Sequence, residues 1–132
     1  MPWITDLDSV IFTRIKYKLE KKFKTKYPDF NVTNTDKSLK EPKFPNVYIQ
    51  VLGNPESGET TEAEEINAVT YTMQIDVTTK TQLSTREVSD EVINILKEMM
   101  FKGVAFPYPS NTDDTFRNIA RFRRTIAVGD TI

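Results

Sequence analysis

The sequence contains neither cysteine nor histidine, and this double absence limits the chemistry open to its 132 residues. Without cysteine there is no disulfide, no thiolate nucleophile and no cysteine-ligated zinc. Without histidine, the commonest general base and metal ligand is missing as well. Only four glycines are present, and no phosphate-loop or nucleophile-elbow motif occurs. We therefore expect a protein that is not an enzyme and that has no catalytic residue, no metal and no cofactor.

Long apolar runs are also missing. No stretch approaches the roughly 20 apolar residues that span a bilayer, and the opening residues MPWITDLDSV carry acids where a signal peptide carries bases. The hydrophobic share of 38% and the charged share of 28% are those of an ordinary globular protein. The length suits one compact domain over 1–132. We expect an intracellular, single-domain protein without membrane contact.

The formal net charge is only −1, which argues against a polycation that seeks nucleic acid. The charges are nevertheless segregated along the chain. Seven basic residues and one acid, Glu20, lie between Arg14 and Lys26. The middle of the chain is acidic, with Glu56, Glu59, Glu62, Glu64 and Glu65, and the last sixteen residues hold four of the six arginines, Arg117, Arg121, Arg123 and Arg124. Opposed patches suit head-to-tail self-association; ordinary solvated surface charge is the alternative.

Hydrophobic periodicity predicts two amphipathic helices. The first covers about 5–26, because apolar residues recur every four positions from Leu7 to Phe23 and Pro28 then stops the helix. The second covers about 85–101, because Ser84 and Glu87 have capping-box spacing just before an apolar stripe. Gly103 is the expected left-handed residue that ends this second helix.

Alternating apolar and polar residues predict strands near 30–32, within 44–53, over 69–77 and over about 117–128, with an extended piece at 104–110. The fold class is therefore α+β: a mainly antiparallel sheet of four to five strands with two amphipathic helices packed on one face. In the last strand, alternation places Arg121 and Arg123 on one face together with Arg117. Arg124 lies on the opposite face with Phe122.

These segments together resemble a known family. The amino-terminal helix, 43-KFPNVYIQV-51, the acidic loop over 54–65, 69-VTYTMQIDVTTK-80 with the helix that follows it, and 107-PYPSNTDDTFRNIARFRRTI-126 are similar to the tail-terminator proteins of tailed bacteriophages. These proteins are also called tail-completion or tail-to-head joining proteins. The resemblance covers nearly the whole chain and consists of element order and loose pattern.

The resemblance implies a structural virion protein at the head-proximal end of the tail, assembled in the host cytoplasm. Six copies would form a ring that caps the tail tube, stops its polymerisation and offers a docking surface for the head-completion or neck protein. DNA would pass through the lumen without sequence-specific binding. The implied contacts with a neighbouring subunit or the tube involve Arg117, Arg121, Arg123, Arg124, Glu59, Glu62, Glu64 and Glu65. A neck, head-completion or minor capsid component is the nearest alternative.

Two other functional classes stay open. In the first, Tyr48 and Phe122 combine with the basic last strand to make a stacking and phosphate platform for nucleic acid. In the second, adjacent carboxylates such as Asp113 and Asp114 serve a small enzyme, although neither this pair nor Glu64 with Glu65 has the spacing of a calcium loop.

Overall fold

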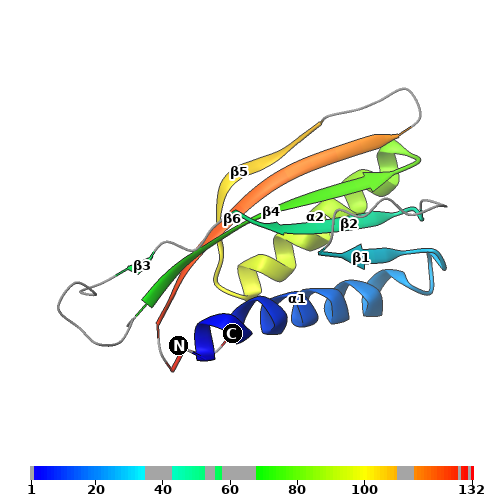
Figure 1. The fold of residues 1–132 in the computed structure, drawn as a ribbon. Helices are drawn as coiled ribbons and strands as arrows, with labels where there is room; N and C mark the ends of the chain where they lie inside the picture. Colours follow the sequence, from blue (N-terminus) through cyan, green and yellow to red (C-terminus); the bar gives the residue numbers. More distant parts are fainter. Residues whose placement is uncertain are drawn as a thin grey trace.

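The computed structural model describes residues 2–34, 43–52, 56–57, 68–109, 115–127, 129–130 and 132. Within them, two helices and six strands follow one another along the chain (Figure 1). In order they are α1 (Pro2–Phe23), β1 (Asn31–Thr33), β2 (Asn46–Val51), β3 (Glu56–Ser57), β4 (Ala68–Thr79), α2 (Gln82–Glu98), β5 (Lys102–Pro109) and β6 (Phe116–Ala127).

The strands form one sheet in the order β1-β2-β4-β6-β5, and the two-residue β3 pairs with the start of β4. β1 runs parallel to β2, whereas the other pairings are antiparallel. The two longest strands, β4 and β6, are paired along their whole length, from Ala68 opposite Ala127 to Thr79 opposite Phe116. The predicted α+β fold with a mainly antiparallel sheet and two packed helices is confirmed.

Both helices pack on the same face of this sheet. The residues of α1 that recur every four positions are all buried: Leu7, Ile11, Ile15, Leu19 and Phe23. They share one hydrophobic cluster with the apolar side of α2 and with alternate strand residues such as Tyr71, Met73 and Phe122. The opposite face of the sheet therefore has no helix over it among the described residues, and it carries mainly polar side chains, with the apolar Ile119 opposite Asp76.

The boundaries of α1 differ from those predicted. The helix begins at Pro2, three residues early, and proline is well tolerated in the first turn because its missing amide has no intrahelical partner there. It ends at Phe23 instead of residue 26, but two backbone hydrogen bonds with helical spacing follow. Lys24 N donates to Glu20 O at 2.9 Å and Tyr27 N to Phe23 O at 2.7 Å, so the turn continues almost to Pro28.

The predicted start of α2 was wrong by three residues. The N-cap is Thr81, not Ser84, and α2 begins at Gln82. Thr81 Oγ1 accepts the Ser84 amide at 3.1 Å, and Ser84 Oγ donates back to Thr81 O at 3.1 Å. The predicted capping box is not formed: the Thr81 amide donates to Thr79 Oγ1 at 3.3 Å, and Thr81 alone caps the free amide of Ser84. A threonine cap satisfies the same free amides as a serine cap, so the sequence offered two equivalent registers.

The predicted end of α2 was also wrong. Met100, with φ 67°, is the left-handed residue, and Gly103 lies inside β5. The Met100 amide bonds to Lys97 O at 3.0 Å, and the Phe101 amide to Leu96 O at 2.9 Å, which is the Schellman pattern. Phe101 is buried in the core cluster. Its burial fixes where the helix must stop, and Met100 adopts the conformation that this stop requires.

Met100→Gly is therefore expected to raise the free energy of unfolding by about 0.5–1 kcal/mol, because glycine adopts positive φ without a Cβ clash. The Met100 side chain is 71% exposed, so little packing is lost. Met100→Ala is the matched control, since it removes the side chain but keeps the strain. Equal stability of the two variants in urea unfolding would contradict this explanation.

Acids of α2 pair with three lysines of the basic segment 14–26. Lys18 and Lys22 of α1 pair with Glu98 at 3.2 Å and Glu91 at 3.5 Å, and Lys26, which follows α1, pairs with Glu87 at 2.7 Å. The hydrogen bond to Glu87 raises the pKa of Lys26. Such exposed pairs add little stability each, but they show that much of this basic segment is neutralised within the chain.

Candidate functional site: the helix-free sheet face

We name the sheet surface turned away from α1 and α2 the helix-free face. On β6, Arg117, Arg121 and Arg123 share this face, as the alternation in the sequence predicted. Their register partners on β4 are Thr78, Gln74 and Thr72, respectively. The residues between them, such as Ala120 and Phe122, point into the core.

A buried carboxylate organises one end of the face. Asp76 is only 5% exposed, and Arg117 Nη2 donates a short hydrogen bond to its Oδ2. Gln74 Nε2 donates to Asp76 Oδ1 at 3.1 Å, and Arg121 Nε donates to Gln74 Oε1 at 3.0 Å. Asp76 thus orients Arg117 directly and Arg121 through Gln74. The carboxylate thus fixes the positions of two guanidinium groups on this face.

A second pair of cations lies where β5 meets β6. Lys102 is the register partner of Arg123, so both side chains project from the same face of neighbouring strands. Both are exposed, and neither has an ion pair or side-chain hydrogen bond within the part of the chain that the structure describes. Like charges directly opposite each other destabilise a sheet. This pair is therefore a local cost to the isolated subunit.

Arg124 has a different role from its neighbours. It lies on the helix-facing side of β6, and its Nη1 donates to Met99 O at 2.9 Å, at the carboxyl end of α2. A cation there is favourable because the last helical carbonyls carry partial negative charge. Arg124 fixes α2 to the sheet, and we do not retain it among the interface candidates. The sequence had already separated it from Arg121 and Arg123.

The acidic segment is attached at one end of the sheet. Its first residues form β3, which pairs with β4 through Glu56 opposite Val69 and Ser57 opposite Ala68. The predicted loop over 54–65 thus contains a short strand. The remaining predicted interface acids, Glu59, Glu62, Glu64 and Glu65, lie outside the described residues, as do Asp113 and Asp114.

The predicted nucleic-acid platform does not form. Tyr48 is paired with Asp76 and lies on the helix-free face, whereas Phe122 is paired with Met73 on the other face. Phe122 is only 4% exposed and cannot stack on a base. The two aromatic residues therefore lie on opposite sides of the sheet.

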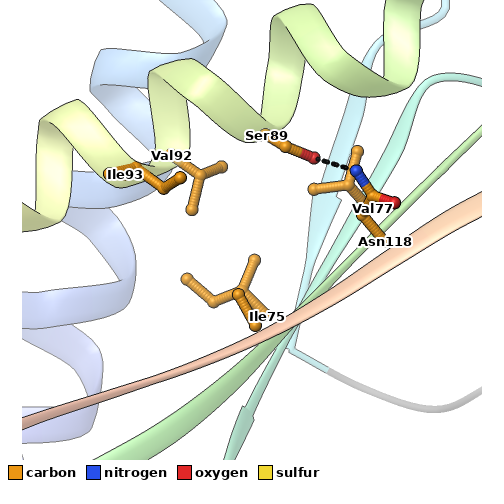
Figure 2. A pocket seen from close by; sticks show the side chains of 7 residues that line it. Ile75, Val77, Ser89, Val92, Ile93 and Asn118 are labelled. Atoms are coloured by element: carbon orange, nitrogen blue, oxygen red, sulfur yellow. Dashed lines mark hydrogen bonds between the residues drawn. The ribbon is translucent and has the colours of Figure 1, made fainter. Parts of the chain in front are cut away.

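Hollows also lie beside each of the two helices. The cavity between α2 and the sheet has a volume of about 10 Å³, room for roughly one water, and its side chains are mainly apolar (Figure 2). Ser89 Oγ there accepts from Asn118 Nδ2 at 3.2 Å. A groove of about 310 Å³ lies between α1 and β2, with Asp8 and Tyr71 in its lining. The first is a packing gap, and the second offers one carboxylate beside a buried phenol.

Sequence reasoning missed three residues of the site: Asp76, Gln74 and Lys102. The pattern over 69–77 predicts only that Asp76 and Gln74 lie on the polar side of a strand, and the predicted helix stop at Gly103 leaves Lys102 outside the predicted strands. Strand register decides which of these residues meet the arginines. No sequence pattern in the chain specifies that register, because β4 and β6 lie far apart in the sequence.

Among the described residues, no group of three or more acidic side chains is placed to hold a metal ion. No helix in that part of the chain is both long and apolar enough to cross a membrane. Comparison with protein-family models and with curated protein sequences finds no match.

Proposed function

We propose that this chain is a structural virion protein of a tailed phage or prophage, of the tail-terminator kind, that assembles into a ring on the end of the tail tube. The observation that carries the proposal is the helix-free face with its excess cations. Arg123 and Lys102 have no described partner there, whereas Lys18, Lys22 and Lys26 of the basic segment 14–26 are paired with α2. On the helix-free face, two cations that lie directly opposite each other on β5 and β6 are thus left without a described counterion.

A ring needs two different surfaces on each subunit that fit each other, because its contacts are head-to-tail. The arginines of the helix-free face supply one such surface. Arginine suits this role because its planar fork binds carboxylates in a fixed geometry. The network around Asp76 supports the same reading, since it holds Arg117 and Arg121 in place before any partner arrives.

The proposed ring caps the tube, halts its growth and presents the other side to a head-completion or neck protein. Another station in the neck, or a minor capsid role, would use the same surface. Nucleic-acid binding is the competing use of exposed cations, and it predicts a different experimental result.

Mass photometry and native mass spectrometry of the purified chain test the proposal. We expect a closed oligomer of about 91 kDa, six copies of the 15.2 kDa chain, that dissociates as the salt concentration is raised. Arg121→Glu with Arg123→Glu should weaken this assembly at least about tenfold, which is a modest loss for charged interface contacts. Arg14→Glu with Lys21→Glu is the matched control, because it makes the same charge change on α1.

A chain that stays monomeric at every concentration would contradict the proposal. Steeply salt-dependent DNA binding by that monomer would favour the nucleic-acid module instead.

A further inference from the structure

We propose that Lys102, Arg121 and Arg123 form a receptor for the glutamate-rich segment 59–65 of a neighbouring copy. We call these three residues the cation triplet. The inference rests on the proposed self-assembly and names the contact that produces it. It adds Lys102, which only the strand register brings to this surface.

The first support is the unfavourable placement of Lys102 and Arg123. They are directly opposite each other on β5 and β6, and no described residue neutralises either one. Two like charges in this position repel each other across the strand pair. An anion bound between them would convert that repulsion into two attractions. The pair is therefore better suited to a bound complex than to an isolated subunit.

The second support is the way Arg121 is held. Arg121 Nε donates a hydrogen bond to Gln74, and no described residue accepts one from the two Nη groups of Arg121. The edge of the guanidinium that carries both Nη groups can bind a carboxylate through two parallel hydrogen bonds. Gln74 is itself anchored to the buried Asp76. Arg121 is thus prepared for a carboxylate at little further cost in side-chain entropy.

The third support identifies the partner. The segment 59-ETTEAEE-65 contains four carboxylates and no basic residue, so it complements three neighbouring cations. Ser57 and Ala68 form the last pair of the β3–β4 hairpin, and Ala68 is also opposite Ala127 at the end of β6. Ser57 and Ala68, which flank the segment in the sequence, therefore lie at that end of the sheet.

The cation triplet of the same chain lies further inward. Arg123 is opposite Thr72, four residues along β4 from Ala68, which corresponds to about 13 Å. A second copy is the occupant that we propose, because its glutamate-rich segment complements the charge of the triplet and because a ring is built from head-to-tail contacts between copies.

Charge-reversal substitutions on the cation triplet and on the glutamate-rich segment test the inference. Variant A carries Lys102→Glu with Arg123→Glu, and variant B carries Glu62→Lys with Glu64→Lys. We expect each variant alone to assemble at least about tenfold more weakly than wild type, and the mixture of A with B to recover assembly. The chain that carries all four changes should assemble alone. Arg14→Glu with Lys21→Glu again controls for net charge.

A stability measurement distinguishes a binding role from a structural one. Arg123→Glu places an acid opposite Lys102, so we expect its Tm to rise by roughly 1–4 °C while its assembly is lost. A contact that served only the fold would lose stability instead. Lys102→Gln with Arg123→Gln provides a neutral version if variant A folds poorly.

The outcomes separate this inference from the proposed function. Wild-type assembly that is unchanged in A and B would overturn the receptor while leaving the ring in place. A wild-type chain that stays strictly monomeric would overturn this inference together with the ring. Loss of DNA binding in A, with unchanged assembly, would assign the triplet to phosphate.

Discussion

Asp76→Ala is expected to lower the free energy of unfolding by about 2–3 kcal/mol. Asp76 is 5% exposed, and it accepts from both Arg117 and Gln74. Its removal leaves Arg117 without its carboxylate and releases Gln74 from the position in which it holds Arg121. The loss should be smaller than for a fully buried ion pair, because the Arg117 side chain is 39% exposed to water.

Urea unfolding of Asp76→Ala, Arg117→Ala and the double variant measures this effect as a coupling energy. We expect Asp76 and Arg117 to be coupled by about 1–2 kcal/mol, because each single change removes their ion pair but leaves the other charged group on the sheet. Thr72→Ala is a control on the same face of β4, where no described partner is lost. A loss below about 0.5 kcal/mol for Asp76→Ala would mean that the network does not hold the arginines in place.

The second large effect concerns Tyr71 in alkaline solution. The Tyr71 side chain is 2% exposed, and its burial, together with the neighbouring Asp8, raises the pKa of the phenol above its usual range. In the unfolded chain the phenol loses its proton near pH 10, whereas the folded chain keeps it. Unfolding then releases a proton, so stability must fall as pH rises above about 10, by roughly 1.4 kcal/mol per pH unit from this group.

Tyr71→Phe removes that contribution. At pH 8 the variant should be about 1 kcal/mol less stable than wild type, because it lacks the hydroxyl contact with Asp8. The difference should vanish near pH 11 and then reverse in sign. Tyr17→Phe is the control for loss of one tyrosine at an exposed position. Parallel stability curves for wild type and Tyr71→Phe from pH 8 to 11.5 would contradict the assignment.

The elements of this fold were largely predictable from local pattern. The four-residue spacing from Leu7 to Phe23 identified α1, and strict alternation identified β4. Both patterns work because each element buries one side against a single core. The alternation of Arg121, Arg123 and Arg124 between two faces followed from the same rule.

The errors fell at helix ends and at long-range pairings. Thr81 and Ser84 are both competent caps, and the choice between them depends on how the chain leaves β4. Gly103 was the natural helix stop, but the burial of Phe101 moved the left-handed residue to Met100. The partners of Arg117 and Arg123 depend on strand register between distant segments, which local sequence does not encode.

The structure also changes which charges matter for assembly. The basic segment 14–26 stood out in the sequence, yet three of its lysines pair with glutamates of α2. For Lys102, by contrast, the sequence predicted no role, yet in the structure it lies opposite Arg123 without a described partner. Segregated charge in a sequence thus indicates an interface only where the charges do not form ion pairs within the chain.

The central claim is that copies of this chain contact one another through the helix-free face. Native mass spectrometry that compares wild type with Arg123→Glu, from low to high micromolar protein concentration in low salt, tests it most directly. The account predicts a discrete closed oligomer for wild type and monomers for the variant, with the variant folded and at least as stable to heat. Identical oligomers for both proteins, or a wild-type chain that stays monomeric throughout, would contradict it.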